Sequence, residues 1–161
     1  MSKKYLVIFL LPIILLYACG KSPDFGGCPS TGGIPTATEM ADLKAFITSK
    51  NITATEDSRG FYYQISNPGY GVDAPTASTT VQVKYRGTFT NGAVFDSTKA
   101  GEPAIFQLSG TVLGFQYGVP LIKKTGVIDL YLPPSLAYGC AGRGNIPGNS
   151  ILIFHIELIN Y

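Results

Sequence analysis

Apolar and polar residues alternate in several short stretches over the second two thirds of the chain. A period of two places successive side chains on opposite faces of a strand, so that one face is buried while the other meets water. Glycine, proline and asparagine separate the stretches, and Asn91-Gly92 is a typical tight-turn pair. The pattern predicts strands over residues 61–66, 80–89, 104–108, 126–132 and 151–159.

Helical spacing appears in two places. Thr36 and Glu39 have the spacing of a capping box, and apolar residues follow at helical intervals to about Ser49. The stretch 111–122 also has helical spacing, but its glycines and Pro120 limit its length. We therefore predict an α+β domain in which a twisted antiparallel sheet wraps around a short helix, preceded by a helical extension.

The first residues of the chain form its most hydrophobic segment. Lys3 and Lys4 precede an apolar run over residues 5–18, which is the plan of a secretory signal. The run is shorter than the roughly 20 apolar residues that span a bilayer. Because residues 16–19, Leu-Tyr-Ala-Cys, resemble a bacterial lipobox, we expect cleavage before Cys19 and acylation of its thiol. The alternative is a plain signal peptide followed by an unmodified cysteine.

These patterns divide the chain into four parts. Residues 1–18 are expected to be a lipoprotein signal peptide, and residues 19–35, rich in glycine, serine, proline and threonine, a flexible tether. Residues 36–78 would form an N-terminal extension with one helix and a lead-in strand, and residues 79–161 the main domain. The expected location is the bacterial cell envelope, anchored by lipid at the outer membrane or the periplasmic face.

Charge and reactive residues exclude several classes of function. The chain has 161 residues and a formal net charge of +2, which removal of Lys3 and Lys4 with the signal reduces to zero. A neutral chain is not expected to bind nucleic acid through bulk charge. The sequence has no clustered metal ligands or nucleophile motif, and its one histidine, His155, falls on the outward side of a predicted strand. Cys28 and Cys140 would pair in an exported protein or remain free thiols.

Four motifs in one order resemble the FKBP-type peptidyl-prolyl cis-trans isomerases. Residues 83–98, VKYRGTFTNGAVFDST, are similar to the family's strand, turn and Phe-Asp-Ser signature. Residues 106–122, 130–139 and 146–159 are similar to its later motifs, among them LYLPPSLAYG and IPGNSILIFHIELI. The resemblance covers about residues 79 to 159 and implies the FKBP-like fold for the main domain.

The same resemblance implies a pocket that receives the prolyl ring of a peptide. The expected catalytic residues are Tyr85, Phe95, Asp96, Tyr138 and Phe154. The expected substrate-binding residues are Phe106, Val112, Leu113, Phe115 and Ile146. In this assignment Phe115 forms the floor, while the Tyr138 hydroxyl and the Leu113 amide bind the ligand. Asp96 either interacts with the twisted carbonyl or orders Tyr85 through a hydrogen bond.

The implied reaction suits an apolar pocket without cofactor or metal. Amide resonance gives X-Pro rotation a barrier of roughly 18–20 kcal/mol, and a dry pocket disfavours the polar planar amide more than the twisted one. We expect an isomerase that acts on proline-containing polypeptides among exported proteins, as a monomer. The alternatives are a peptide-binding or chaperone lipoprotein with little isomerase activity, and a lipoprotein that uses the domain only as a scaffold.

Overall fold

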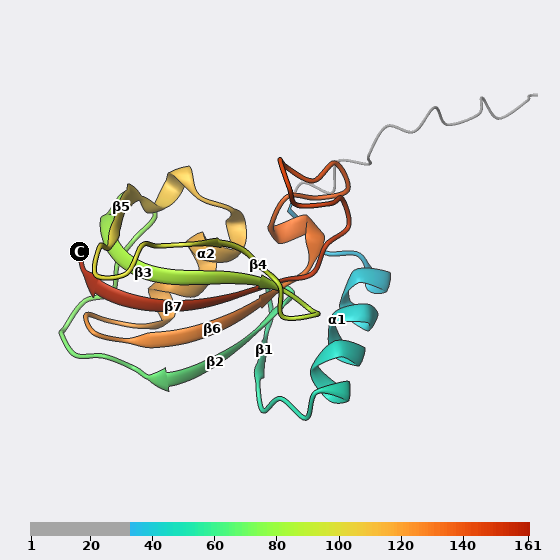
Figure 1. Ribbon diagram of the computed structural model, residues 1–161. Helices are drawn as coiled ribbons and strands as arrows, with labels where there is room; N and C mark the ends of the chain where they lie inside the picture. Colours follow the sequence, from blue (N-terminus) through green and yellow to red (C-terminus); the bar gives the residue numbers. More distant parts are fainter. Residues whose placement is uncertain (1–32) are drawn as a thin grey trace, which may run out of the picture.

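The computed structural model describes residues 33–161, in which one antiparallel sheet is the main feature (Figure 1). Six strands follow the order β1-β2-β6-β7-β3-β4, and β5 also pairs with β3. The strands are β1 (Thr55–Asp57), β2 (Phe61–Asn67), β3 (Thr80–Phe89), β4 (Val94–Ser97), β5 (Ala104–Gln107), β6 (Val127–Leu132) and β7 (Leu152–Asn160). The predicted fold class is confirmed. The predicted signal, the predicted tether up to residue 32, the lipidated Cys19 and Cys28 lie outside the described residues.

Five of these strands match the predicted ranges to within one residue at each end, and β1 and β4 were not predicted. Asn91-Gly92 forms the turn between β3 and β4, where Gly92 has a φ of 85° and its amide donates to the Phe89 carbonyl at 2.9 Å. His155 is exposed on β7, with Nδ1 2.7 Å from Asp129 Oδ1. The outward position predicted for this residue is therefore confirmed.

The helix α1 (Ala37–Ser49) packs on the outer face of the sheet. Its predicted capping box is present, because the Thr36 hydroxyl accepts from the Glu39 amide and the Glu39 carboxylate accepts from the Thr36 amide. Leu43 is fully buried, and Tyr62 and Tyr131 of β2 and β6 belong to the same apolar cluster. The N-terminal extension is thus joined to the sheet by a core of its own.

The helix α2 (Leu113–Gly118) lies against the other face of the sheet and is short, as its sequence predicts (Figure 1). Gly114 and Gly118 face Leu132 and Leu130 of β6 so closely that a Cβ atom at either glycine would overlap the leucine side chain. The 3-10 turn η2 (Val119–Leu121) contains Pro120 and follows α2 directly. Close backbone approach at the two glycines therefore sets how near α2 lies to the main core.

One edge of β3 is shared by two short strands. Residues 86–88 pair with β4 and residues 80–83 pair with β5, while β7 pairs along the opposite edge. Between the two ladders, Thr98 bonds to the backbone of Tyr85: its amide donates to the Tyr85 carbonyl at 3.0 Å and its hydroxyl accepts from the Tyr85 amide at 3.2 Å. Tyr85 thus has satisfied backbone groups at the break between the two strands.

The helices and Cys140 of the described residues can be compared with the predicted signal segment and disulfide. No helix within residues 33–161 is long and apolar enough to cross a membrane. Cys140 is disulfide-bonded, and its pairing with Cys28 stays a prediction because Cys28 lies outside the described range.

Candidate active site

A hollow of about 580 Å³ opens between the sheet and α2. Strands β3, β4 and β7 and the helix each contribute side chains to its wall. The structure brings together eight residues that the sequence predicted for the pocket: Tyr85, Asp96, Phe106, Val112, Leu113, Phe115, Tyr138 and Phe154. Residues from positions 85 to 154 of the chain therefore meet in one concave site.

The floor of the hollow is the ring of Phe115, whose residue is only 4% exposed. Its centroid lies 4.8 Å from that of Phe154, with the ring planes at 90°. The centroid of the Tyr85 ring lies 6.1 Å from that of Phe115, with the planes at 90°, and the centroid of Phe106 lies 6.3 Å away. Edge-to-face contacts of this kind stabilise aromatic clusters beyond the burial of their area. The packing holds the floor in one orientation.

Phe95 and Ile146 take positions outside the lining. The Phe95 ring packs behind Phe154, with centroids 5.4 Å apart and planes at 87°, and it also contacts Phe89 at 5.1 Å. Ile146 is 8% exposed and belongs to the main core. Phe95 therefore supports a wall of the hollow, whereas Ile146 contributes to the main core.

Tyr85 and Asp96 form the one hydrogen-bonded pair of predicted residues in the hollow. The Tyr85 hydroxyl donates to Asp96 Oδ2 at 2.6 Å, so the bond expected from the sequence is present. Burial raises the pKa of Tyr85, and the hydrogen bond to the Asp96 carboxylate raises it further. Tyr85 consequently stays protonated through neutral pH and acts as the donor in this pair.

The rim of the hollow has free hydrogen-bonding groups. Among residues 33–161, the Tyr138 hydroxyl has no hydrogen-bond partner, and it belongs to a half-buried residue of the lining. Leu113 is the first residue of α2, so its amide has no acceptor within the helix. These are the two groups for which the sequence predicted contacts with a ligand.

Several lining residues were missed from the sequence, namely Gly110, Thr111, Gln116, Ala137 and Arg143. Gln116 Nε2 donates to the Thr111 carbonyl at 2.8 Å and so fixes the segment before α2. The Arg143 guanidinium carbon lies 5.9 Å from the Tyr138 ring centroid, within cation–π range. Gln116 could have been found from its position one helical turn after Leu113, whereas the glycine-rich sequence around Arg143 gave no such signal.

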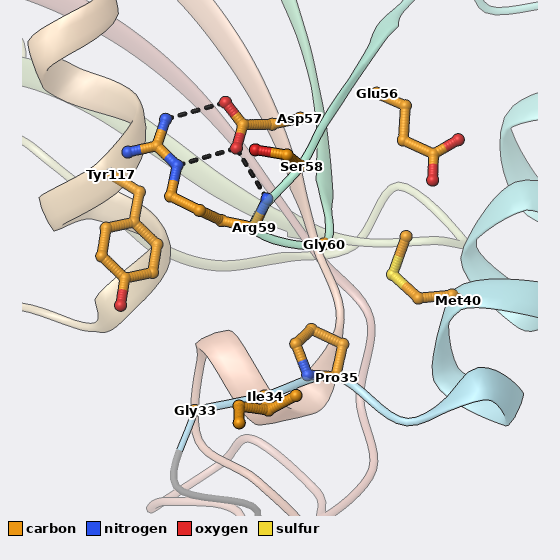
Figure 2. Close-up of a pocket in the computed structure, with 10 residues that line it drawn as sticks. All are labelled: Gly33, Ile34, Pro35, Met40, Glu56, Asp57, Ser58, Arg59, Gly60 and Tyr117. Atoms are coloured by element: carbon orange, nitrogen blue, oxygen red, sulfur yellow. Dashed lines mark hydrogen bonds and ion pairs between the residues drawn. The ribbon is translucent and has the colours of Figure 1, made fainter.

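A second, larger hollow of about 720 Å³ lies beside the β1–β2 turn (Figure 2). Figure 2 shows the Arg59 guanidinium directed at both carboxylate oxygens of Asp57. Both hydrogen bonds are 2.7 Å long, and the guanidinium carbon lies 5.0 Å from the Tyr117 ring centroid. The hydrogen bond and charge of Arg59 lower the pKa of Asp57. Because these charged groups satisfy one another and no aromatic cluster forms a floor, the hollow at Phe115 is the better candidate site.

Metal binding has no support in the described part of the chain. No group of three histidine, cysteine or carboxylate side chains within residues 33–161 is arranged to hold an ion. Asp96 also makes no ion pair with a basic side chain there.

Known proteins with similar sequences share one family. Residues 71–159, more than half of the chain, match the model of the FKBP-type peptidyl-prolyl cis-trans isomerases. The isomerase FkpA of Escherichia coli K12 is 46% identical over 104 residues, which are 64% of this chain and 38% of FkpA. FkpA of Buchnera aphidicola from Schizaphis graminum is 41% identical over 119 residues, 73% of this chain and 46% of the relative. The chain thus spans less than half the length of these relatives.

Solved structures agree in fold. The crystal structure of FkpA from Escherichia coli has a TM-score of 0.69 and 40% identity, over 77% of this chain and 59% of FkpA. A peptidyl-prolyl isomerase from Pseudomonas syringae has a TM-score of 0.65 and 27% identity, over 78% of this chain and 94% of that one. On the extent of the family match, together with the motifs that form the hollow, the chain belongs to the FKBP-type peptidyl-prolyl cis-trans isomerase family.

Proposed function

We propose that this chain catalyses cis-trans rotation about X-Pro bonds in polypeptides. The observation that carries the proposal is the aromatic hollow, in which a buried Phe115 ring forms the floor and Phe154 and Tyr85 form walls. A pyrrolidine ring is apolar and matches such a surface in chemistry. The polar groups of the substrate then lie at the rim, near Tyr138, Arg143 and the start of α2.

The geometry supports catalysis by differential stabilisation of the twisted amide. Rotation breaks the conjugation of the amide, and the twisted form has less charge separation than the planar form. Exclusion of water by Phe115, Phe154 and Tyr85 therefore raises the free energy of the planar ground state relative to the transition state. The Tyr138 hydroxyl is placed to donate to a substrate carbonyl and so to keep the bond under rotation over the floor.

Asp96 acts in this proposal mainly through Tyr85. Its hydrogen bond fixes the Tyr85 ring against Phe115, with the two ring planes perpendicular, and so holds this wall of the hollow in place. In an Asp96→Asn variant the side chain keeps its size but the bond loses its charge. We expect kcat/KM to fall about threefold to tenfold, the range for one charge-assisted hydrogen bond weakened in a partly exposed site.

A protease-coupled or refolding-based prolyl isomerisation assay on the full chain, purified in mild detergent, tests the function. The expected result is catalysis that saturates with an X-Pro peptide and is weakened in Asp96→Asn. Binding of the peptide with no acceleration of isomerisation would instead support a peptide-binding or chaperone role. Absence of both binding and catalysis would leave the domain as a scaffold and would refute the proposal.

We also propose that the protein is a monomeric lipoprotein of the bacterial envelope that acts on exported polypeptides. Support comes from the apolar run over residues 5–18 and from Cys19, which follows directly after it. Attachment of more than one acyl chain gives stable membrane binding, whereas a single chain is marginal. Fractionation of cells that express Cys19→Ala is expected to move the protein out of the membrane fraction. Unchanged retention in the membrane would refute lipid anchoring at this residue.

A further inference from the structure

Glu39 of α1 contacts a turn that belongs to the active-site region of the chain. Its carboxylate accepts from the Ser135 amide at 2.9 Å and from the Ser135 hydroxyl at 2.7 Å. Ser135 lies in the 3-10 turn η3 (Pro134–Leu136), 96 residues further along the chain. Among the described residues, Glu39 is the one acceptor of this amide. The bond is therefore a specific link between two elements far apart in sequence.

The turn η3 leads directly into the lining of the hollow. Ala137 and Tyr138 follow Leu136, and both line the site. The amides of Ala137 and Gly139, on either side of Tyr138, donate to the Pro134 carbonyl at 2.9 Å and 2.8 Å. The backbone at Tyr138 is thus held by Pro134, which is the residue immediately before Ser135. A shift of the turn at Ser135 would be transmitted to the Tyr138 ring.

The anchoring residue lies outside the part of the chain that matches the family model. That match begins at residue 71, whereas α1 ends at Ser49. The same carboxylate also accepts from the Thr36 amide at 2.7 Å, so it caps α1 and holds η3 at once. Both of its oxygens are in use, and a side chain with a single acceptor oxygen can serve one of these roles but not both.

We propose that Glu39 is a positioning residue for the isomerase site, which it serves by holding the η3 turn and hence the Tyr138 ring in place. The proposal rests on the proposed isomerase function. In this arrangement the N-terminal extension contributes to the site, because the Glu39 carboxylate of α1 determines where the Tyr138 hydroxyl lies. Docking of α1 on the sheet and the shape of the rim are then coupled through a single side chain.

Glu39→Gln separates this role from helix stability. Glutamine at this position is compatible with a capping box, so α1 keeps its N-terminal cap while the charged link to Ser135 is lost. Thr36→Ala is the matched control, because it removes the hydroxyl that caps the Glu39 amide at 3.2 Å and leaves Ser135 untouched. Ser135→Ala removes the hydroxyl donor of the link, while the amide at this position still donates to Glu39.

The experiment measures kcat/KM for an X-Pro tetrapeptide with the full chain, in wild-type and Tyr138→Phe backgrounds. We expect Glu39→Gln to lower kcat/KM about threefold to tenfold in the wild-type background and by less than about 1.5-fold in Tyr138→Phe, where the positioned hydroxyl is already absent. Thr36→Ala is expected to lower the melting temperature without this loss. An equal loss in both backgrounds, or an equal loss in Thr36→Ala, would overturn the proposal.

A spectroscopic measurement keeps the test independent of the isomerase function. The NMR resonances of the Tyr138 ring and amide are expected to shift in Glu39→Gln and in Ser135→Ala, and to stay in place in Thr36→Ala. If the wild-type chain showed no isomerase activity, the proposed function would fail while the shift would still report the coupling. Unmoved Tyr138 resonances in both link variants would refute the positioning role itself.

Discussion

Gly87 lies behind the wall of the hollow, and its replacement by alanine tests whether the aromatic packing there sets activity. A Cβ atom at Gly87 would lie 2.5 Å from Phe95 Cζ, 2.6 Å from Phe95 Cε2 and 3.1 Å from Phe154 Cε1. Optimal contacts between carbon atoms are about 3.5–4.0 Å, so the Phe95 ring has to move by about 1 Å and the Phe154 ring by a few tenths of an ångström.

Two opposing effects set the size of the change in stability. Overpacking of this kind costs about 1–3 kcal/mol, whereas replacing glycine by alanine reduces the entropy of the unfolded chain and gains about 0.4–1 kcal/mol. The steric effect should win because Phe95 is itself packed between Phe89 and Phe154. We expect a net loss of about 0.5–2 kcal/mol in the free energy of unfolding, and a loss of about threefold to tenfold in kcat/KM as Phe154 shifts.

Urea unfolding followed by circular dichroism, with the disulfide kept intact, measures the first quantity, and the peptide isomerisation assay measures the second. The double variant Gly87→Ala/Phe95→Leu removes the ring atoms that the new Cβ would meet. It should therefore recover part of the activity lost in Gly87→Ala. If Gly87→Ala is more stable than the wild type and equally active, the chain-entropy effect dominates and the packing argument is wrong.

Three further predictions concern the rim and the N-terminal extension. The wild type should prefer peptides with glutamate rather than glutamine beside the proline by about twofold to fivefold in kcat/KM, because exposed ion pairs contribute about 0.2–1 kcal/mol. Arg143→Gln should abolish this preference. Equal kcat/KM for both peptides in the wild type would refute the prediction. Burial acts to raise the pKa of Glu39, but hydrogen bonds from Thr36 and Ser135 outweigh it and hold the pKa below its ordinary value of 4.5. The charged form therefore stabilises the fold above pH 4.5, and the stabilisation is lost as pH falls through the lowered pKa. In urea unfolding, Glu39→Gln should have a lower free energy of unfolding than the wild type near neutral pH, and the difference should shrink in acid. A difference that does not change with pH would contradict the assignment. Leu43→Ala should lower the free energy of unfolding by about 2–5 kcal/mol, because Leu43 of α1 is fully buried against the sheet. A loss below about 1 kcal/mol in urea unfolding would show that α1 is weakly docked.

The sequence predicted the long strands well because burial imposes alternation on them. β3 and β7 each have one face in the core, and their apolar residues recur every second position. β1 has only three residues, Thr55–Asp57, none of them apolar, so it carries no such pattern. Its pairing with β2 depends on the turn that follows it, and β4 is held as a strand by its ladder with β3.

The family resemblance predicted lining residues both in strands and in loops, such as Phe154 and Tyr138, and it missed Gln116 of α2 and Arg143. Tyr85 and Phe154 face the same side because the register pairs Gly87 with Phe154 and Tyr85 with Ile156. Arg143 reaches the rim because its backbone pairs with Ile146, a contact set by the conformation of the whole glycine-rich loop. The link from Glu39 to Ser135 has the same origin, since no local pattern relates residues 96 positions apart.

The division of one edge of β3 between two short strands has a consequence for variation in this chain. Because β4 and β5 pair with separate parts of β3, the segment from Lys99 to Pro103 can change in length without altering the register of either ladder. For a flexible loop, each doubling of length costs only about 0.6 kcal/mol in closure entropy. The break beside Tyr85 is therefore a place where insertions can be accepted next to the hollow, and where new recognition elements can be added to the fold without rebuilding its sheet.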